Sequence, residues 1–275
     1  MKQALIASLR AATGGMTPAL AKVAETVLGQ PQATLYQSIT ELAETSGSSE
    51  ASVMRFCREQ GFSGFQDFKL ALAKELAGEE RENGAATPAD DIQRLVETAI
   101  VSLRETEQLI VREDVAKAAS RLLAAQVIEC FGVAASAVTA QYLSYKMSRI
   151  GMLSRAFADA HLATMAAGTA TRETAHVIIS SSGSTIDAVE VAKLARSRGA
   201  FVLGISNRSK SPLVAVCDLT LIASWPETPL TGGAFPSKIS QLLIVDALLA
   251  EMMRQDPARV GLIQSTAESV SDRSF

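Results

Sequence analysis

The segment that decides the fold is HVIISSSGSTIDAVEVAKLARSRGAFVLGIS, residues 176–206. It starts as a short apolar run, passes through a hydroxyl-rich loop into a stretch of helix length, and ends in a second apolar run. Such runs recur throughout this part of the chain, at 127–131, 152–156, 176–180, 201–206 and 219–223. Alternating strands and helices are typical of a parallel sheet with helices on both faces. We therefore predict a doubly wound α/β domain with a five-stranded parallel sheet.

The chain before this region has a different pattern. Apolar residues recur at helical spacing, and Thr17-Pro18 is a typical helix start. The segment 78–91, GEERENGAATPADD, replaces that periodicity with charge, glycine and proline, as linkers do. The 275 residues also exceed the usual length of one domain. We predict a small all-helical domain at 1–77, a linker at 78–91 and the α/β domain at 92–275.

Within the helical domain, Ala43, Gly47 and Val53 have the spacing of a helix-turn-helix. The small Ala43 lets two helices approach, Gly47 permits the turn, and Val53 fills the angle between the helices. Ser48 or Ser49 is expected to cap the second helix, whose N-terminal end would enter a DNA groove. The same spacing is equally compatible with a purely structural hairpin. The predicted DNA-contacting residues are Ser49, Glu50, Ser52, Val53, Arg55 and Arg58.

The loop at 180–185 combines five hydroxyl side chains with one glycine, between a predicted strand and a predicted helix. Free N–H groups and the dipole at a helix N-terminus attract anions, and hydroxyls add further donors, so a phosphate monoester is the natural ligand. The other reading is that the serines only cap helices. The loop after the first strand and two more distant residues could complete the site. The candidate ligand-binding residues are Ala135, Ser136, Ser180, Ser182, Gly183, Ser184, Thr185, His161 and Lys238.

Several classes of protein are excluded by what the sequence lacks. Uninterrupted apolar runs are too short for a membrane helix, and Arg10 interrupts any signal-peptide core, so we expect a cytoplasmic protein. The three cysteines and two histidines lack metal-ligand spacing, and neither a Walker loop nor a G-x-G-x-x-G motif is present. We therefore predict no metal, no cofactor and no catalytic residue. A net charge of −3 provides no general attraction to DNA or membranes.

Three stretches resemble one family of bacterial regulators. SEASVMRFCREQGFSGFQDFK, residues 49–69, resembles the recognition helix of the ribose-phosphate-isomerase-repressor (RpiR) family. ISSSGSTIDAVEVAKLARSRGA, residues 179–200, resembles the phosphate loop of sugar isomerase (SIS) domains, and FGVAAS, residues 131–136, resembles their first loop. The resemblance implies that the hydroxyls of Ser180, Ser182, Ser184 and Thr185 and the backbone at Gly183 hold a phosphate, with Ser136 lining the same pocket. Ala134 departs from the family, which commonly has glycine there.

This resemblance implies a DNA-binding transcription regulator of carbohydrate metabolism whose SIS domain senses a phosphorylated sugar. Its partners would be double-stranded operator DNA and the sugar phosphate. A homodimer or homotetramer is expected, because the predicted helices at 137–150 and 241–253 carry more apolar residues than one sheet face can cover. The alternative function is a sugar-phosphate isomerase, which needs a proton-transferring Glu or His near the strand ends. Few such residues fall there: His161 is one, and the 180–185 loop contains no Glu. A third interpretation, an interaction scaffold, leaves the serine cluster unexplained.

Overall fold

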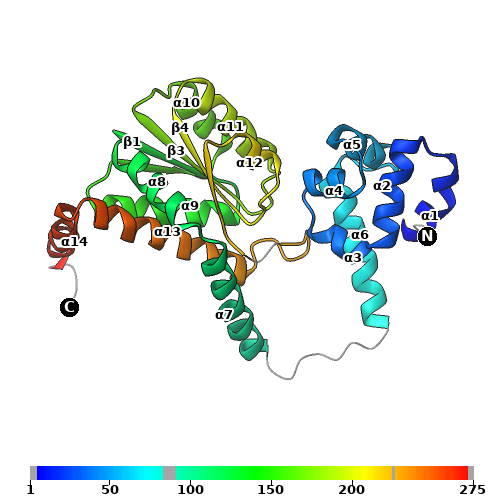
Figure 1. Cartoon of the computed structure of the whole chain (residues 1–275). Coiled ribbons are helices and arrows are strands. Elements are labelled where there is room, and N and C mark those ends of the chain that lie inside the picture. The colour runs from blue at the N-terminus through cyan, green and yellow to red at the C-terminus, as the bar shows by residue number, and fades with distance from the viewer. Residues whose placement is uncertain (1–4, 83–90, 225–226, 272–275) are drawn as a thin grey trace.

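The computed structural model describes residues 5–82, 91–224 and 227–271, which form a helical domain and an α/β domain (Figure 1). The helical domain has one core, in which Phe56 and Phe68 pack edge to face with ring centroids 5.4 Å apart. The 3-10 turn Thr13–Gly15 follows its first helix. Its α-helices are α1 (Leu5–Ala12), α2 (Pro18–Gly29), α3 (Pro31–Tyr36), α4 (Ile39–Thr45), α5 (Glu50–Glu59) and α6 (Phe65–Glu82).

The predicted linker at 78–91 is partly helical. Helix α6 continues to Glu82, five residues beyond the predicted domain boundary at residue 77. The next helix begins at Asp91, and residues 83–90 lie outside the described part of the chain. The glutamate and arginine residues of 79–82 favour helix, and no proline stops it before Pro88. The change from apolar periodicity to charge therefore does not mark the end of the helix.

The α/β domain contains a five-stranded parallel sheet with strand order β2-β1-β3-β4-β5. This order confirms the predicted doubly wound fold. The strands are β1 (Val127–Gly132), β2 (Ser154–Phe157), β3 (Thr174–Ser180), β4 (Phe201–Ser206) and β5 (Leu219–Ile222). The helices are α7 (Asp91–Leu109), α8 (Arg112–Leu123), α9 (Ala135–Arg149), α10 (Ala160–Gly168), α11 (Ile186–Ser197), α12 (Pro212–Val216), α13 (Phe235–Gln255) and α14 (Ala258–Glu268).

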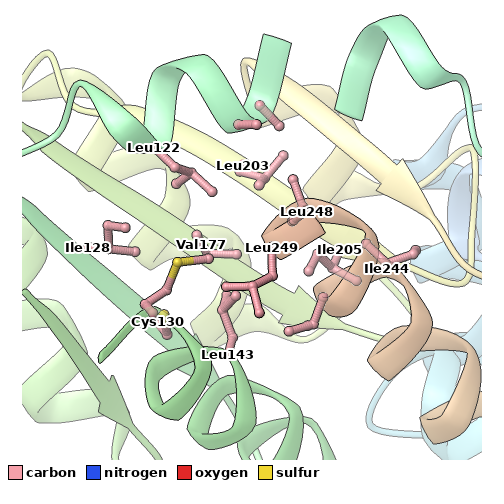
Figure 2. Close-up of a cluster of buried hydrophobic side chains, with 14 of the residues drawn as sticks. Leu122, Ile128, Cys130, Leu143, Val177, Leu203, Ile205, Ile244, Leu248 and Leu249 are labelled. Atoms are coloured by element: carbon pink, nitrogen blue, oxygen red, sulfur yellow. The ribbon is translucent and has the colours of Figure 1, made fainter. Parts of the chain in front are cut away.

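Apolar cores lie on both faces of the sheet. Helices α8, α9 and α13 cover one face, where Leu122, Leu143 and Leu248 meet strand residues such as Val177 and Leu203 (Figure 2). Helices α10, α11 and α12 cover the other face. In the central pair Gly132 of β1 lies beside Ile179 of β3, so the loops that follow these two strands start side by side. This register places both predicted ligand loops at the carboxyl edge of the sheet, where open α/β sheets bind ligands.

The exposed apolar surface that could support the predicted oligomer differs from the one expected from the sequence. On α13, the residues packed in the core of their own chain are Ile244, Val245, Leu248, Leu249 and Met252. On α9, Val138 and Tyr145 remain exposed. The larger exposed apolar surface belongs to α7, where Ile92, Leu95 and Val96 are all exposed. None of the helices in the described ranges is long and apolar enough to span a membrane.

Candidate phosphate site and DNA-contacting helix

The loop at 180–185 is shaped by Gly183. Its φ of +62° lies in the left-handed region, and a Cβ at this position would lie 2.0 Å from Ser211 Oγ. The Gly183 N–H donates to the side-chain oxygen of Ser180 at 3.1 Å, and its carbonyl accepts from Leu213 N at 2.9 Å. Only glycine combines this backbone conformation with so close an approach of the neighbouring segment. Gly183 therefore lets the loop pack closely against the segment after β4.

The hydroxyls of this loop line the N-terminus of α11. Ser180 Oγ and Thr185 Oγ1 lie 3.2 Å apart, and Ser182 Oγ accepts from Ser184 N at 3.2 Å. Thr185 is the N-cap of α11, yet no side-chain hydrogen bond caps this helix within the described residues. Helix capping therefore does not account for the hydroxyl of Thr185. Hydroxyl groups, backbone N–H groups and the positive end of the helix dipole occur together in this loop, a combination suited to an anion.

A polar cluster joins the start of α13 to this loop. Lys238 Nζ donates to Ser181 Oγ at 2.7 Å and to Gln241 Oε1 at 3.2 Å. The fully buried Gln241 donates to Ser181 Oγ at 3.0 Å and to Asn207 Oδ1 at 2.6 Å, and accepts from Thr139 Oγ1 at 3.0 Å. The amide of Gln241 thus fixes the positions of groups from three other segments. Lys238, one of the predicted ligand residues, lies within this cluster.

Lys238 also faces a carboxylate that the sequence analysis did not identify. Its Nζ lies 3.5 Å from Oε1 of Glu227, and both side chains are largely buried. Burial lowers the pKa of Lys238, and the charge of Glu227 acts in the opposite direction. A buried ammonium of this kind gains from a second negative group. An incoming phosphate would supply that charge.

The loop after β1 brings Ala135 and Ser136 to the same edge. Ala134, the N-cap residue of α9, has φ +52° and ψ −123°, a conformation that alanine adopts only under strain. Ser136 is buried, and a Cβ on Gly132 would lie 2.5 Å from its carbonyl oxygen. Ala135 packs against Gly233 in the segment before α13. The departure from glycine at position 134 therefore has a structural cost but leaves the loop in place.

Neither histidine is hydrogen-bonded to the loop within the described residues. His161 is exposed in the first turn of α10, and none of the hydrogen bonds found in the described residues joins it to the 180–185 loop. His176 is buried in β3 at the opposite end of that strand from Ser180, and burial lowers its pKa to about 4. The structure thus joins the predicted serine loop to Lys238 by a hydrogen bond and shows no such bond from His161 within the described residues. Within the described ranges, no group of three potential metal ligands occurs.

The helix-turn-helix is formed by α4 and α5. Gly47, with φ +60°, permits the turn between them, and Ser48 N donates to Ala43 O at 2.8 Å. Ser49 caps α5 by accepting from Ser52 N at 3.2 Å. This agrees with the predicted spacing and cap.

The exposed face of α5 carries most of the predicted DNA contacts. Ser49, Glu50, Arg55 and Arg58 are exposed and Ser52 is half-buried. Arg55 Nε lies 2.8 Å from Glu59 Oε1, an exposed pair that DNA could displace. Val53 is fully buried with Phe56 and Cys57, so its assignment as a DNA contact is wrong. It acts only as the wedge between helices, the other role predicted for it.

Comparisons with known proteins agree with this architecture. Residues 3–79 match the helix-turn-helix domain of the rpiR family, and residues 122–251 match the SIS domain. An uncharacterized HTH-type transcriptional regulator of Caldanaerobacter subterraneus is 33% identical over 98% of both chains. The chain belongs to the RpiR family of transcriptional regulators. Another relative of this RpiR-family protein, the regulator HexR of Pseudomonas aeruginosa, is 35% identical over 82% of this chain and 81% of its own.

A solved structure is similar over nearly the whole RpiR-family chain. The NanR protein of Vibrio vulnificus, complexed with ManNAc-6P, matches with a TM-score of 0.92 and 36% identity. The match covers 98% of this chain and 99% of that one. The chain therefore resembles NanR both in the folds of the two domains and in their arrangement.

Four residues of the polar cluster escaped sequence reasoning: Ser181, Asn207, Glu227 and Gln241. They come from four separate segments, which only the fold brings together. One signal was available. Gln241 shares a helical stripe with Ser237, Ser240, Ile244 and Leu248, all of which are buried. Polar residues at the start of an otherwise apolar stripe indicate a polar interior at that end of the helix.

Proposed function

We propose that this RpiR-family protein binds operator DNA through α5 and senses a phosphorylated sugar in its SIS domain, thereby regulating carbohydrate metabolism in the cytoplasm. The observation that carries the sensing role is the convergence of the 180–185 hydroxyls, the N-terminus of α11 and the buried Lys238. NanR, which was solved with ManNAc-6P, supports this assignment through its similarity over both domains.

The phosphate would be held by donors that the protein already positions. Ser180, Ser182, Ser184 and Thr185 would donate from their hydroxyls, and the backbone around Gly183 would donate N–H groups. Lys238 would contribute a charge from α13, which is stronger in a partly buried site than in water. Ala135 and Ser136 would close the neighbouring side, toward the sugar. His161 would contact the ligand only if α10 lies against it when the ligand is bound.

The DNA contacts would come from Ser49, Glu50, Ser52, Arg55 and Arg58. These residues start the second helix of a helix-turn-helix, the part that enters the major groove. Residues 1–77 carry seven basic and seven acidic side chains, so one domain gains little from counterion release. Pairing two domains in a homodimer, or in a homotetramer, would raise the affinity. The exposed apolar residues of α7 support such an assembly.

A thermal-shift screen tests the sensing role. Full-length protein is heated with a panel of aldose and ketose phosphates, the parent sugars and inorganic phosphate. We expect stabilisation by one or a few sugar phosphates and none by the matching unphosphorylated sugars. A ligand at about 100 times its Kd should add roughly 2.7 kcal/mol to the free energy of unfolding. Equal stabilisation by the parent sugars would contradict the phosphate site.

The isomerase alternative gains one candidate from the structure. Glu227 is a largely buried carboxylate beside the site and could move a proton on an open-chain sugar. Its ion pair with Lys238 favours a binding role, because a general base must be free to accept that proton. Incubating the protein with the stabilising sugar phosphate separates the two functions. We expect the sugar phosphate to remain unchanged, whereas turnover that Glu227→Gln abolishes would establish an isomerase.

A further inference from the structure

The segment after β4 connects the ligand loop to the helix-turn-helix. On one side, Asn207 N donates to Ser181 O at 3.2 Å, and Ser211 packs against Gly183. On the other side, Lys210 O accepts from Ser38 Oγ at 2.6 Å. Ser38 is the N-cap of α4, the first helix of the helix-turn-helix. A single short segment therefore touches both functional sites.

Arg208 is the charged centre of this segment. Its guanidinium is largely buried and lies 3.8 Å from Oε2 of Glu41, a residue of α4. Glu41 also accepts from Ser38 N at 2.7 Å in the capping box of that helix. The charge of Glu227 acts on Arg208 from the side of the ligand loop. Arg208 thus pairs with a carboxylate of the DNA-binding domain, while the charge of a carboxylate beside the ligand loop also raises its pKa.

A second buried cation increases the dependence of this interface on Glu41. Lys69 of α6 donates to Leu35 O at 3.1 Å and to Gln37 O at 2.9 Å. Desolvation lowers the pKa of Lys69 to about 7, with a further decrease caused by the charge of Arg208 and an opposing effect of Glu41. Glu41 therefore compensates two neighbouring cations. If Arg208 loses this partner, its buried charge strongly disfavours the docked arrangement.

We propose that Arg208 is the positioning residue through which occupancy of the 180–185 loop controls docking of α4 on the SIS domain. A bound phosphate would compete with Glu227 for Lys238, which now lies 3.5 Å from it. Glu227, left with less compensation, would attract Arg208 more strongly at the expense of Glu41. Ligand binding would therefore loosen α4 from the SIS domain. This inference rests on the proposed function, because it assigns the residue through which ligand binding at that same site affects the DNA-binding domain.

Hydrogen exchange followed by mass spectrometry tests this route in the full-length protein. The probes are inorganic phosphate and N-acetylmannosamine 6-phosphate at millimolar concentrations. In the wild type, a bound probe should slow exchange in the 180–185 loop and accelerate exchange in α4 at least about fivefold, the lower end of typical couplings between sites. In Arg208→Met, the loop should still be protected while α4 exchanges rapidly with or without probe. Arg208→Lys, which keeps the charge, should retain part of the response.

Two further variants separate charge from structure. Glu41→Gln keeps the capping acceptor but removes the charge, and should behave as Arg208→Met does. It also provides a test if Arg208→Met does not fold. Glu44→Gln breaks the exposed pair in which Lys210 Nζ lies 2.6 Å from Glu44 Oε2, and should respond as the wild type does. This control lies in the same interface and on the same helix.

The outcomes distinguish this inference from the proposed function. If neither these probes nor the wider panel protects the 180–185 loop of the wild type, the proposed function fails. If the loop is protected but α4 is unchanged or slowed, the proposed function stands and the route through Arg208 is wrong. A ligand response of α4 in Arg208→Met equal to that of the wild type would also overturn the route.

Discussion

Gly183→Ala tests the geometry of the ligand loop directly. Gly183 and Gly47 have nearly the same φ, +62° and +60°, but they differ in their surroundings. A Cβ at position 183 would lie 2.0 Å from Ser211 Oγ and 2.5 Å from Ser211 Cβ, whereas nothing lies within 4 Å of one at position 47. The pair of glycines therefore separates the cost of a left-handed backbone from the cost of a steric clash.

The two costs are of known size. An L-residue in the left-handed region costs about 1–2 kcal/mol, so Gly47→Ala should lower the free energy of unfolding by that amount. Gly183→Ala adds overpacking of about 1–3 kcal/mol, for a total of roughly 2–5 kcal/mol. Urea denaturation followed by circular dichroism measures both variants. Gly183→Ala should also lose the stabilisation by sugar phosphate, because the loop must move away from Ser211.

A rescue variant completes the test. Ser211→Gly removes both clashing atoms, at the cost of the cap that Ser211 provides to Val214 N. In the Gly183→Ala background, Ser211→Gly should recover most of the free energy of unfolding that is lost to the steric clash. The loss caused by the left-handed backbone should remain. Equal destabilisation by Gly183→Ala and Gly47→Ala, or no rescue by Ser211→Gly, would refute the close packing of the loop against this segment.

Three further predictions follow from other parts of the chain. Arg55→Ala should weaken operator binding by about 1–3 kcal/mol if the side chain contacts a base, with an unchanged thermal shift by sugar phosphate; equal affinity in a DNA-binding titration would remove α5 from the interface. Since burial lowers the pKa of His176 to about 4 from 6.5, only the unfolded chain takes up its proton between these values. The free energy of unfolding should therefore fall by about 3 kcal/mol as the pH drops through this window, and it should fall less in His176→Gln. Urea titrations at several pH values that give the same pH dependence of the free energy of unfolding for both proteins would contradict this. Sedimentation at micromolar concentration should show an oligomer without DNA, and a single 29.0 kDa species would exclude it.

Much of the α/β domain could be predicted because its buried strands are continuous apolar runs. The prediction for β4, residues 201–206, matches the observed strand residue by residue. The prediction for β2 began at Met152, two residues early, because Met152 is buried in the core without belonging to the edge strand. An apolar run indicates which residues are buried. The buried residues match the bounds of the strand for a central strand such as β4, but not for the edge strand β2.

The candidate site could be predicted only where it is continuous in sequence. The 180–185 loop contains its own hydroxyls, glycine and helix start, so one segment suffices to indicate an anion site. The roles of Glu227 and Arg208 could not be predicted, because their partners, Lys238 and Glu41, are not their neighbours in the sequence. The error at Val53 has another cause. Val53, Phe56 and Cys57 form one buried stripe at helical spacing, and a residue on that stripe cannot also face a DNA groove.

The central claim is that one chain binds a sugar phosphate and that this binding changes its affinity for DNA. Operator binding in the presence of ligand tests this claim most directly. The operator is selected from random duplexes, and its affinity is measured by fluorescence anisotropy with and without the stabilising sugar phosphate. We expect the wild-type affinity to change with ligand. Ser182→Ala and Thr185→Val should bind the same operator equally well but need roughly ten- to a hundredfold more ligand for the same change, since each removes a donor to a charged phosphate. A wild-type affinity that is indifferent to every sugar phosphate that stabilises the protein would contradict the account.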